Sequence, residues 1–152
     1  MKIYLLTHKR ELARQTNTGL VVLSCLGEIV ERVVWDRVNP DLRLVEHIEQ
    51  GEVALMYPDK NAECSNIDSV DNIIVIDATW QEANKIYNKS PYLKSIARVS
   101  LDVQYNSSYH LRRNQPLGGL CTAETIIEFL RQKGNISLAK TLEVNYEKFI
   151  DI

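Results

Sequence analysis

The sequence lacks the short motifs that mark the commonest cofactor sites. Neither G-x-G-x-x-G nor G-x-x-x-x-G-K-[ST] occurs in its 152 residues, which argues against a Rossmann dinucleotide site and a P-loop. Its three cysteines, Cys25, Cys64 and Cys121, are widely spaced and form no C-x-x-C pair. Neither a disulfide framework nor a zinc site is therefore implied, no metal is expected, and a reduced, cytoplasmic setting is the simpler expectation.

Long apolar runs and a strong charge of one sign are also missing. The apolar run in Lys2–Thr7 is too short for a signal peptide, and no segment approaches the length of a membrane-spanning helix, so no membrane association is expected. The formal net charge is -2. Any contact with nucleic acid must therefore come from a local basic patch rather than from the field of the whole protein.

The chain is organised around the stretch from Asn72 to Glu82. Ile73–Ile76 is a short unalternated apolar run, typical of a strand buried on both faces. Thr79 and Glu82 have the spacing of a capping box, which predicts a helix starting at Thr79. Asp77 then lies at the carboxyl end of a central strand, where open α/β sheets bind ligands.

Two side chains of this stretch have ordinary alternatives. Asp77 could be only a cap or a loop hydrogen-bond acceptor. Trp80 either plugs the core, which is the commoner fate of a tryptophan, or forms one wall of a pocket.

The rest of the chain alternates predicted strands and helices. Further strands are predicted in Lys2–Thr7, Glu31–Asp36, Val53–Pro58 and Ile96–Leu101. Helices are predicted in Leu20–Gly27, from Asn39-Pro40 to Gly51, from a cap at Thr122 to Gly134, and over Leu138–Phe149 with Leu138 facing inward. The run Leu20–Gly27 could also be a strand, but the Thr-Asn-Thr-Gly before it favours a helix. Length and alternation predict one α/β domain over residues 1–152, with a mainly parallel sheet flanked by helices.

The segment 102–121 has little periodicity and is long for a loop, which makes it a candidate functional loop. Arg112 and Arg113 stand there among tyrosines and a histidine, a mixture that could contact RNA phosphates and stack on bases, or simply form a solvated face. Gly118-Gly119 could bring backbone amides to a ligand or make a tight turn. A Cys121–histidine dyad is disfavoured, because no local signature surrounds the cysteine.

Four stretches, in order, resemble the DTW-domain family. They are Thr7-His8 with Glu11, Arg14 and Thr16–Gly19; Leu55–Pro58; Asp77-Ala78-Thr79-Trp80; and Tyr109–Arg113 leading to Gly119–Glu124. The family comprises tRNA-uridine aminocarboxypropyltransferases that are similar to the knotted SPOUT methyltransferases. The sequence opens directly on the first predicted strand, where many relatives carry a cysteine-rich, zinc-binding stretch.

The resemblance implies a SPOUT-like, trefoil-knotted fold and transfer of the 3-amino-3-carboxypropyl group of S-adenosylmethionine to N3 of a tRNA uridine. It implies Asp77 as the catalytic base. The implied cofactor-binding residues are Leu55, Tyr57, Pro58, Asp77, Thr79, Trp80, Leu117, Gly119, Leu120 and Thr122. His8, Arg14, Asn17 and Thr18 are expected on the uridine side, and Arg112 and Arg113 on the tRNA backbone. The same chemistry on ribosomal RNA, a methyl transfer, and a non-catalytic RNA-binding module stay open, as does the choice between monomer and homodimer.

Overall fold

A five-stranded parallel sheet forms the centre of the protein, in a computed structural model that describes residues 1–56, 67–101 and 120–151. The strands are β1 (Lys2–Thr7), β2 (Val30–Val34), β3 (Ala54–Met56), β4 (Asn72–Asp77) and β5 (Arg98–Val99). Their order across the sheet is β2-β1-β4-β3-β5, and every neighbouring pair is parallel. The predicted α/β class and parallel sheet are therefore confirmed.

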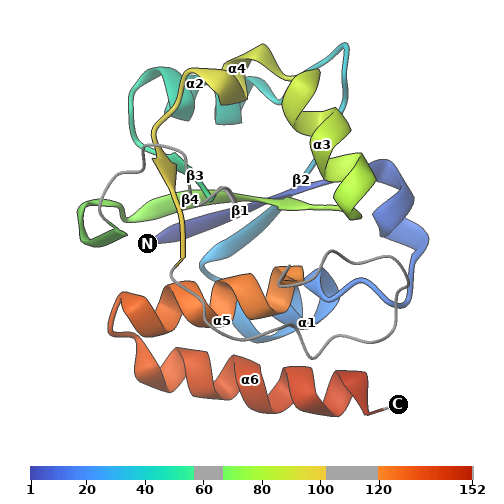
Figure 1. Ribbon diagram of the computed structural model, residues 1–152, viewed down its shortest axis with the longest axis vertical. Helices are drawn as coiled ribbons and strands as arrows, with labels where there is room; N and C mark the ends of the chain where they lie inside the picture. The colour runs from blue at the N-terminus through green and yellow to red at the C-terminus, as the bar shows by residue number, and fades with distance from the viewer. Residues whose placement is uncertain (57–66, 102–119, 152) are drawn as a thin grey trace.

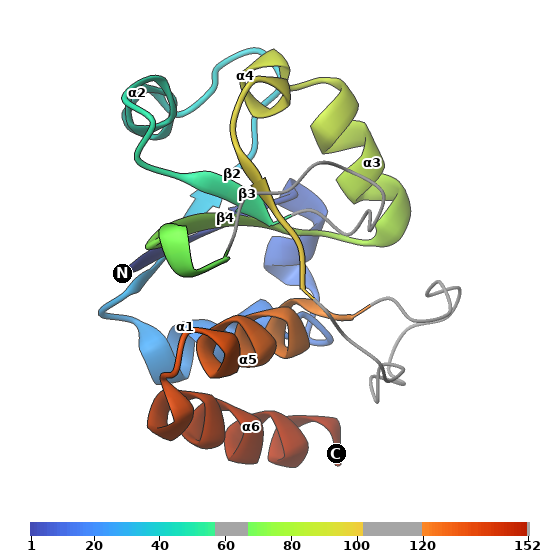
Figure 2. The same cartoon turned by 60° about the vertical axis from the view of Figure 1, so that its left-hand side comes forward.

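Helices cover both faces of this sheet (Figures 1 and 2). One face carries α1 (Gly19–Leu26) and α5 (Thr122–Gln132), and α6 (Ile136–Ile150) packs on these two helices, on their side away from the sheet. The other carries α2 (Leu42–Glu49), α3 (Trp80–Asn88) and the short α4 (Pro91–Lys94). Two 3-10 helices, η1 (Lys9–Ala13) and η2 (Ile67–Ser69), lie in the connections.

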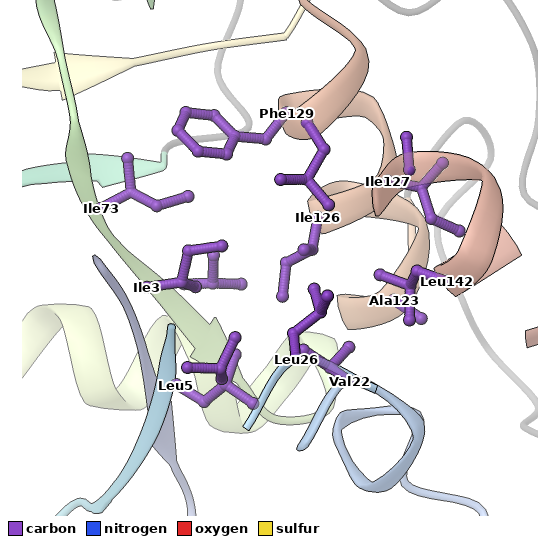
Figure 3. Packing of buried hydrophobic residues seen from close by; sticks show 14 of the residues in the cluster. Ile3, Leu5, Val22, Leu26, Ile73, Ala123, Ile126, Ile127, Phe129 and Leu142 are labelled. Carbon is purple, nitrogen blue, oxygen red and sulfur yellow. The ribbon is translucent and has the colours of Figure 1, made fainter. Parts of the chain in front are cut away.

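The central strands supply both hydrophobic cores. Ile3 and Ile73 point to the α5 side, where Figure 3 shows them opposite Ile126 and Phe129. The alternate strand residues, such as Ile74, point to the α2–α4 side. Burial on both faces explains why β1 and β4 read as continuous apolar runs in the sequence.

Two of the predicted helix caps are wrong by one or two residues. Helix α2 begins at Leu42, and its cap is Asp41, whose side chain accepts a hydrogen bond from Leu44 N at 2.9 Å. Asn39 lies two residues before this cap, in a turn where its backbone N–H donates to Asp36 Oδ1 at 3.0 Å. Helix α5 has Cys121 as its N-cap residue, and Thr122 is its first helical residue.

Helix α1 confirms the helical interpretation of Leu20–Gly27, but its predicted cap is absent. The Thr18 side chain makes no cap hydrogen bond to α1. Its hydroxyl instead accepts a hydrogen bond from Ala123 N at 3.1 Å. Thr18 thus ties the start of α1 to the start of α5.

The inward position predicted for Leu138 is also wrong, because α6 turns Ala139, Leu142 and Tyr146 into the core and leaves Leu138 39% exposed. The described residues do not test the predicted trefoil knot. The knot stays a prediction.

We expect Leu142→Ala to lower the free energy of unfolding by about 2–5 kcal/mol, because it deletes a fully buried side chain between α6 and α5. Leu138→Ala removes the same atoms from the exposed side of the same helix and should cost less than about 1 kcal/mol. Urea unfolding of the two variants measures both values. Equal losses would contradict the orientation of α6 in this structure.

Candidate functional site

The candidate site lies where β1 and β4 end side by side. Thr7 and Asp77 are register partners in the parallel ladder, so both strands finish at the same edge of the sheet. The loop after β1, the start of α3 and the start of α5 meet around this edge. Asp77 is 1% exposed, at the strand end beside a helix start as the sequence predicts.

The Asp77 carboxylate accepts hydrogen bonds from three separate parts of the fold. Its Oδ1 accepts from Asn17 Nδ2 and from Thr122 Oγ1, both at 2.9 Å. Its Oδ2 accepts from Thr7 Oγ1 at 3.1 Å and lies 3.6 Å from Arg32 Nη2. One buried side chain therefore joins β1, β2, the loop before α1 and the start of α5.

Burial raises the pKa of Asp77 above that of a free aspartate. The hydrogen bonds from Thr122 and Asn17 and the charge of Arg32 act in the opposite direction, whereas the nearby Glu11 carboxylate adds to the rise. Because the net direction is upward, Asp77 is a stronger proton acceptor than an exposed aspartate.

Close packing against this carboxylate requires a glycine at the start of α1. A Cβ added at Gly19 would lie 2.7 Å from Asp77 Oδ2 and 2.8 Å from Asn17 Oδ1. Both contacts are shorter than real Cβ contacts, so any larger side chain there must displace one of the two groups.

A second cluster adjoins the first through Asn17. The Asn17 amide donates to Glu11 Oε1 at 2.9 Å, and Glu11 in turn bonds Arg14. Arg14 also holds Glu82 through two hydrogen bonds of 2.9 and 3.0 Å. These bonds raise the pKa of Arg14 and, against the effect of burial, lower the pKa of Glu82 to about 2.

Glu82 also completes the predicted capping box. Thr79 N donates to Glu82 Oε1 at 3.1 Å, and Glu82 N donates to Thr79 Oγ1 at 3.3 Å. The same side chain thus starts α3 and holds Arg14, which joins the α3 start to the loop after β1.

His8 lies at the edge of this second cluster. Its Nδ1 accepts a hydrogen bond from Arg10 N at 3.1 Å and lies 3.8 Å from Glu82 Oε2. The ring stacks against Trp35 with 6.0 Å between ring centroids. An accepting Nδ1 leaves Nε2 as the nitrogen that carries the proton in the neutral ring.

The structure brings together Asp77, Asn17, Thr18 and Thr122 among the predicted site residues, with His8, Arg14 and Thr79 beside them. Leu55 is fully buried and Leu120 lies next to the start of α5. Tyr57, Pro58, Arg112, Arg113, Leu117 and Gly119 lie outside the described residues.

The commoner fate of a tryptophan, burial in the core, does not apply to Trp80. It is 49% exposed, because it is the first residue of α3 and lies off the stripe of Glu82 and Ile86 that this helix buries. Its indole is free to line a surface at the candidate site.

Cys121 does not have the properties of a nucleophile. It is buried, and burial raises the pKa of its thiol to about 12, so the reactive thiolate is scarce at neutral pH.

Within the described ranges, no group of three or more histidine, cysteine, aspartate and glutamate side chains could hold a metal ion. No helix of the described part of the chain is long and apolar enough to cross a bilayer.

A family model described as "DTW domain" matches residues 1–152. The chain belongs to the DTW-domain family. It is also similar to tRNA-uridine aminocarboxypropyltransferase 2 of Drosophila melanogaster, with 27% identity over 141 residues. That alignment covers 85% of this chain and 55% of the relative, so the chain spans about half the length of that protein. No solved structure matches the chain significantly.

Sequence reasoning about this DTW-domain protein missed Arg32 and assigned no role to Glu11. Arg32 Nη2 donates to Asn17 Oδ1 at 2.9 Å, and its buried Nε has no hydrogen-bond partner in the described part of the chain. Because an arginine only donates, it fixes the Asn17 amide with its oxygen toward Arg32 and its nitrogen toward the two acids. The available signal was a cation inside a strand, on the same face as Val30.

We expect Gly19→Ala to destabilise the protein by about 1–3 kcal/mol, because the new methyl group meets the Asp77 carboxylate. In an Asp77→Ala background the same change should cost less, since the contact with the carboxylate is gone and only the contact with Asn17 Oδ1 remains. Urea unfolding of the four proteins measures this coupling. An equal cost in both backgrounds would show that the carboxylate is not what Gly19 accommodates.

Glu82→Gln should lower stability by about 1–3 kcal/mol at neutral pH, because it leaves Arg14 with a weaker partner. The pKa of Glu82 falls from 4.5 to about 2 on folding, so its contribution is present above pH 4.5 and lost as the pH falls toward 2. The difference in the free energy of unfolding between wild type and variant, measured by urea unfolding, should therefore shrink over that pH range. Glu49→Gln, on the exposed side of α2, is the control, and a gap that does not depend on pH would refute the ion pair.

Proposed function

We propose that this chain transfers the 3-amino-3-carboxypropyl group of S-adenosylmethionine to N3 of a uridine in tRNA. Family membership and the name of the Drosophila relative support the reaction class. The single observation that carries the proposal in this structure is the buried Asp77 carboxylate, whose pKa is raised, at the carboxyl edge of a parallel sheet.

The charges around Asp77 fit a cationic donor. The two linked clusters hold three carboxylates, Asp77, Glu11 and Glu82, against the two guanidinium groups of Arg14 and Arg32. The formal sum is one negative charge in excess, in a largely buried setting where charges interact strongly. A sulfonium cation or an incoming proton would each balance it.

S-adenosylmethionine supplies an electrophilic methylene carbon beside a sulfonium, which departs as a neutral thioether when uridine N3 bonds to that carbon. The chain must therefore supply a base for the N3 proton, and no general acid is required. Asp77 is the candidate, because its pKa is raised while that of Glu82 is lowered to about 2 and leaves Glu82 ionised.

The partners of Asp77 define how a substrate would reach it. Thr7 and Asn17 are buried, whereas Thr122 and Arg32 are partly exposed. Both substrates would thus reach the carboxylate from its partly exposed side, and uridine N3–H would replace one of the hydrogen bonds to it. Asn17 would keep the carboxylate oriented during the proton transfer.

Orientation also decides which group moves, since a sulfonium has three carbon substituents. We assign the binding of the donor to the three loops that contain Leu55, Thr79, Trp80, Leu120 and Thr122, together with Tyr57, Pro58, Leu117 and Gly119. The side chain of Leu55 lies in the core, so its contribution would come from the backbone. His8, Arg14, Asn17 and Thr18 are assigned to the uridine side, and Arg112 and Arg113 to the tRNA backbone.

Asp77→Asn should lower kcat about 100-fold or more, because an amide cannot accept the N3 proton, while affinity for S-adenosylmethionine stays within a few fold. The measurement is mass spectrometry of nucleosides from unmodified tRNA incubated with protein and S-adenosylmethionine. Asp71→Asn is a matched control, since Asp71 is exposed and directly precedes the opposite end of β4.

Each alternative gives a different outcome in this experiment. Wild-type rates with Asp77→Asn would remove Asp77 as the base. A methylated uridine would replace the proposed reaction by methyl transfer. Unmodified tRNA, with aminocarboxypropyl uridine formed in ribosomal RNA, would identify ribosomal RNA as the substrate. If neither RNA were modified, the non-catalytic RNA-binding module would be the remaining interpretation.

A further inference from the structure

The stretch that follows Glu82, with most of α3 and all of α4, carries a local concentration of positive charge. Residues 83–101 contain no aspartate or glutamate, and they contain four cations, Lys85, Lys89, Lys94 and Arg98. The chain as a whole has a formal net charge of -2. The positive charge of this stretch is therefore local.

Most other cations of the described residues are neutralised by acids. Such pairs include Lys2–Glu31 at 3.8 Å, Lys9–Asp36 at 3.5 Å, Lys133–Asp71 at 3.5 Å and Lys140–Glu143 at 3.4 Å. In residues 1–56, 67–101 and 120–151, no ion pair involves Lys85, Lys89 or Lys94, and all three side chains are exposed. Their ammonium groups are available to a partner.

The exposed positions of α3 form one continuous face. They are Trp80, Gln81, Asn84, Lys85 and Asn88, continued by the C-cap residue Lys89. Their spacing of three and four residues places them together along the helix, and every one of these side chains can donate a hydrogen bond. An acid-free face of donors fits a polyanion and does not fit an acceptor-poor partner.

This face begins at the candidate site. Trp80, the first residue of α3, follows Asp77 by three positions, and Figures 1 and 2 show α3 and α4 next to each other on the sheet face opposite α5 and α6. A long polyanion lying along α3 would thus reach the edge of the sheet where Asp77 lies.

We infer that the exposed face of α3 and α4 binds the tRNA backbone, with Lys85, Lys89 and Lys94 on phosphates. The inference deepens the proposed function and rests on it for the identity of the RNA. Phosphate contacts of this kind fix the register and orientation of a nucleic acid without reading its sequence. On this protein they would hold the target uridine at the Asp77 edge.

The test compares two double variants of matched design. Lys85→Gln with Lys89→Gln removes two cations from α3, and Lys140→Gln with Lys148→Gln removes two exposed cations from α6, on the other side of the sheet. Fluorescence anisotropy with labelled, unmodified tRNA gives Kd at several salt concentrations. Urea unfolding of each variant establishes that it is folded.

The α3 variant should bind tRNA about 10-fold more weakly than wild type at physiological salt. In a plot of the logarithm of the association constant against log salt, the magnitude of the slope should be lower by about 1.5. The variant makes two fewer phosphate contacts, so its binding releases fewer counterions. The α6 variant should keep both the affinity and the slope. Lys94→Gln added to the α3 variant should lower the slope further.

A folded α3 variant with wild-type affinity and slope would overturn the surface and leave the proposed reaction untouched. If the wild type bound tRNA and the α3 variant lost affinity as predicted, but the wild type formed no aminocarboxypropyl product, the binding surface would be supported and the proposed reaction would be wrong. Equal losses in the α3 and α6 variants would overturn the inference, since they would indicate a global charge effect. If the α3 variant lost binding to phosphatidylserine vesicles and kept its affinity for tRNA, the surface would face a membrane and the inference would be wrong.

Discussion

The Asp77 carboxylate is the interaction on which the organisation of the site depends. An ionised group that is 1% exposed is stable only when its hydrogen bonds are made, and here the donors come from residues far apart in the chain. Holding Asp77 in place therefore also holds the end of β1, the entry to α1 and the entry to α5. The burial that strengthens these hydrogen bonds also raises the pKa of the Asp77 carboxyl, which makes it a better proton acceptor.

Asn17 links the hydrogen bonds of Asp77 to the second cluster, and Arg32 fixes the orientation of the Asn17 amide. Its amide nitrogen donates to both Asp77 and Glu11, while its oxygen accepts from Arg32. Through Glu11 and Arg14 the network continues to Glu82, which starts α3. A continuous series of hydrogen bonds and ion pairs thus connects the helix that begins the proposed RNA-binding face to the proposed base.

Local patterns in the sequence predicted much of this arrangement. The apolar run Ile73–Ile76, the capping box of Thr79 and Glu82, and the position of Asp77 at the strand end are each encoded by neighbouring residues, and the structure confirms them. Arg32 could not be found in the same way, because its partners are 15 and 45 positions away and only the strand order brings them together. The need for glycine at position 19 arises from the same non-local packing. The exposure of Trp80 depends on which face α3 buries, and a residue at the first turn of a helix does not reveal that face.

The central claim is that folding turns Asp77 into a proton acceptor, and its carboxyl carbon reports this directly. Carbon-13 NMR titration of the folded protein, with Asp77→Asn to assign the signal, gives the midpoint of this one group without requiring RNA or a donor. The account predicts a midpoint above 3.8, the value of an unperturbed aspartate. A midpoint at or below 3.8 would show that the hydrogen bonds outweigh burial, and would contradict a role for Asp77 as the base.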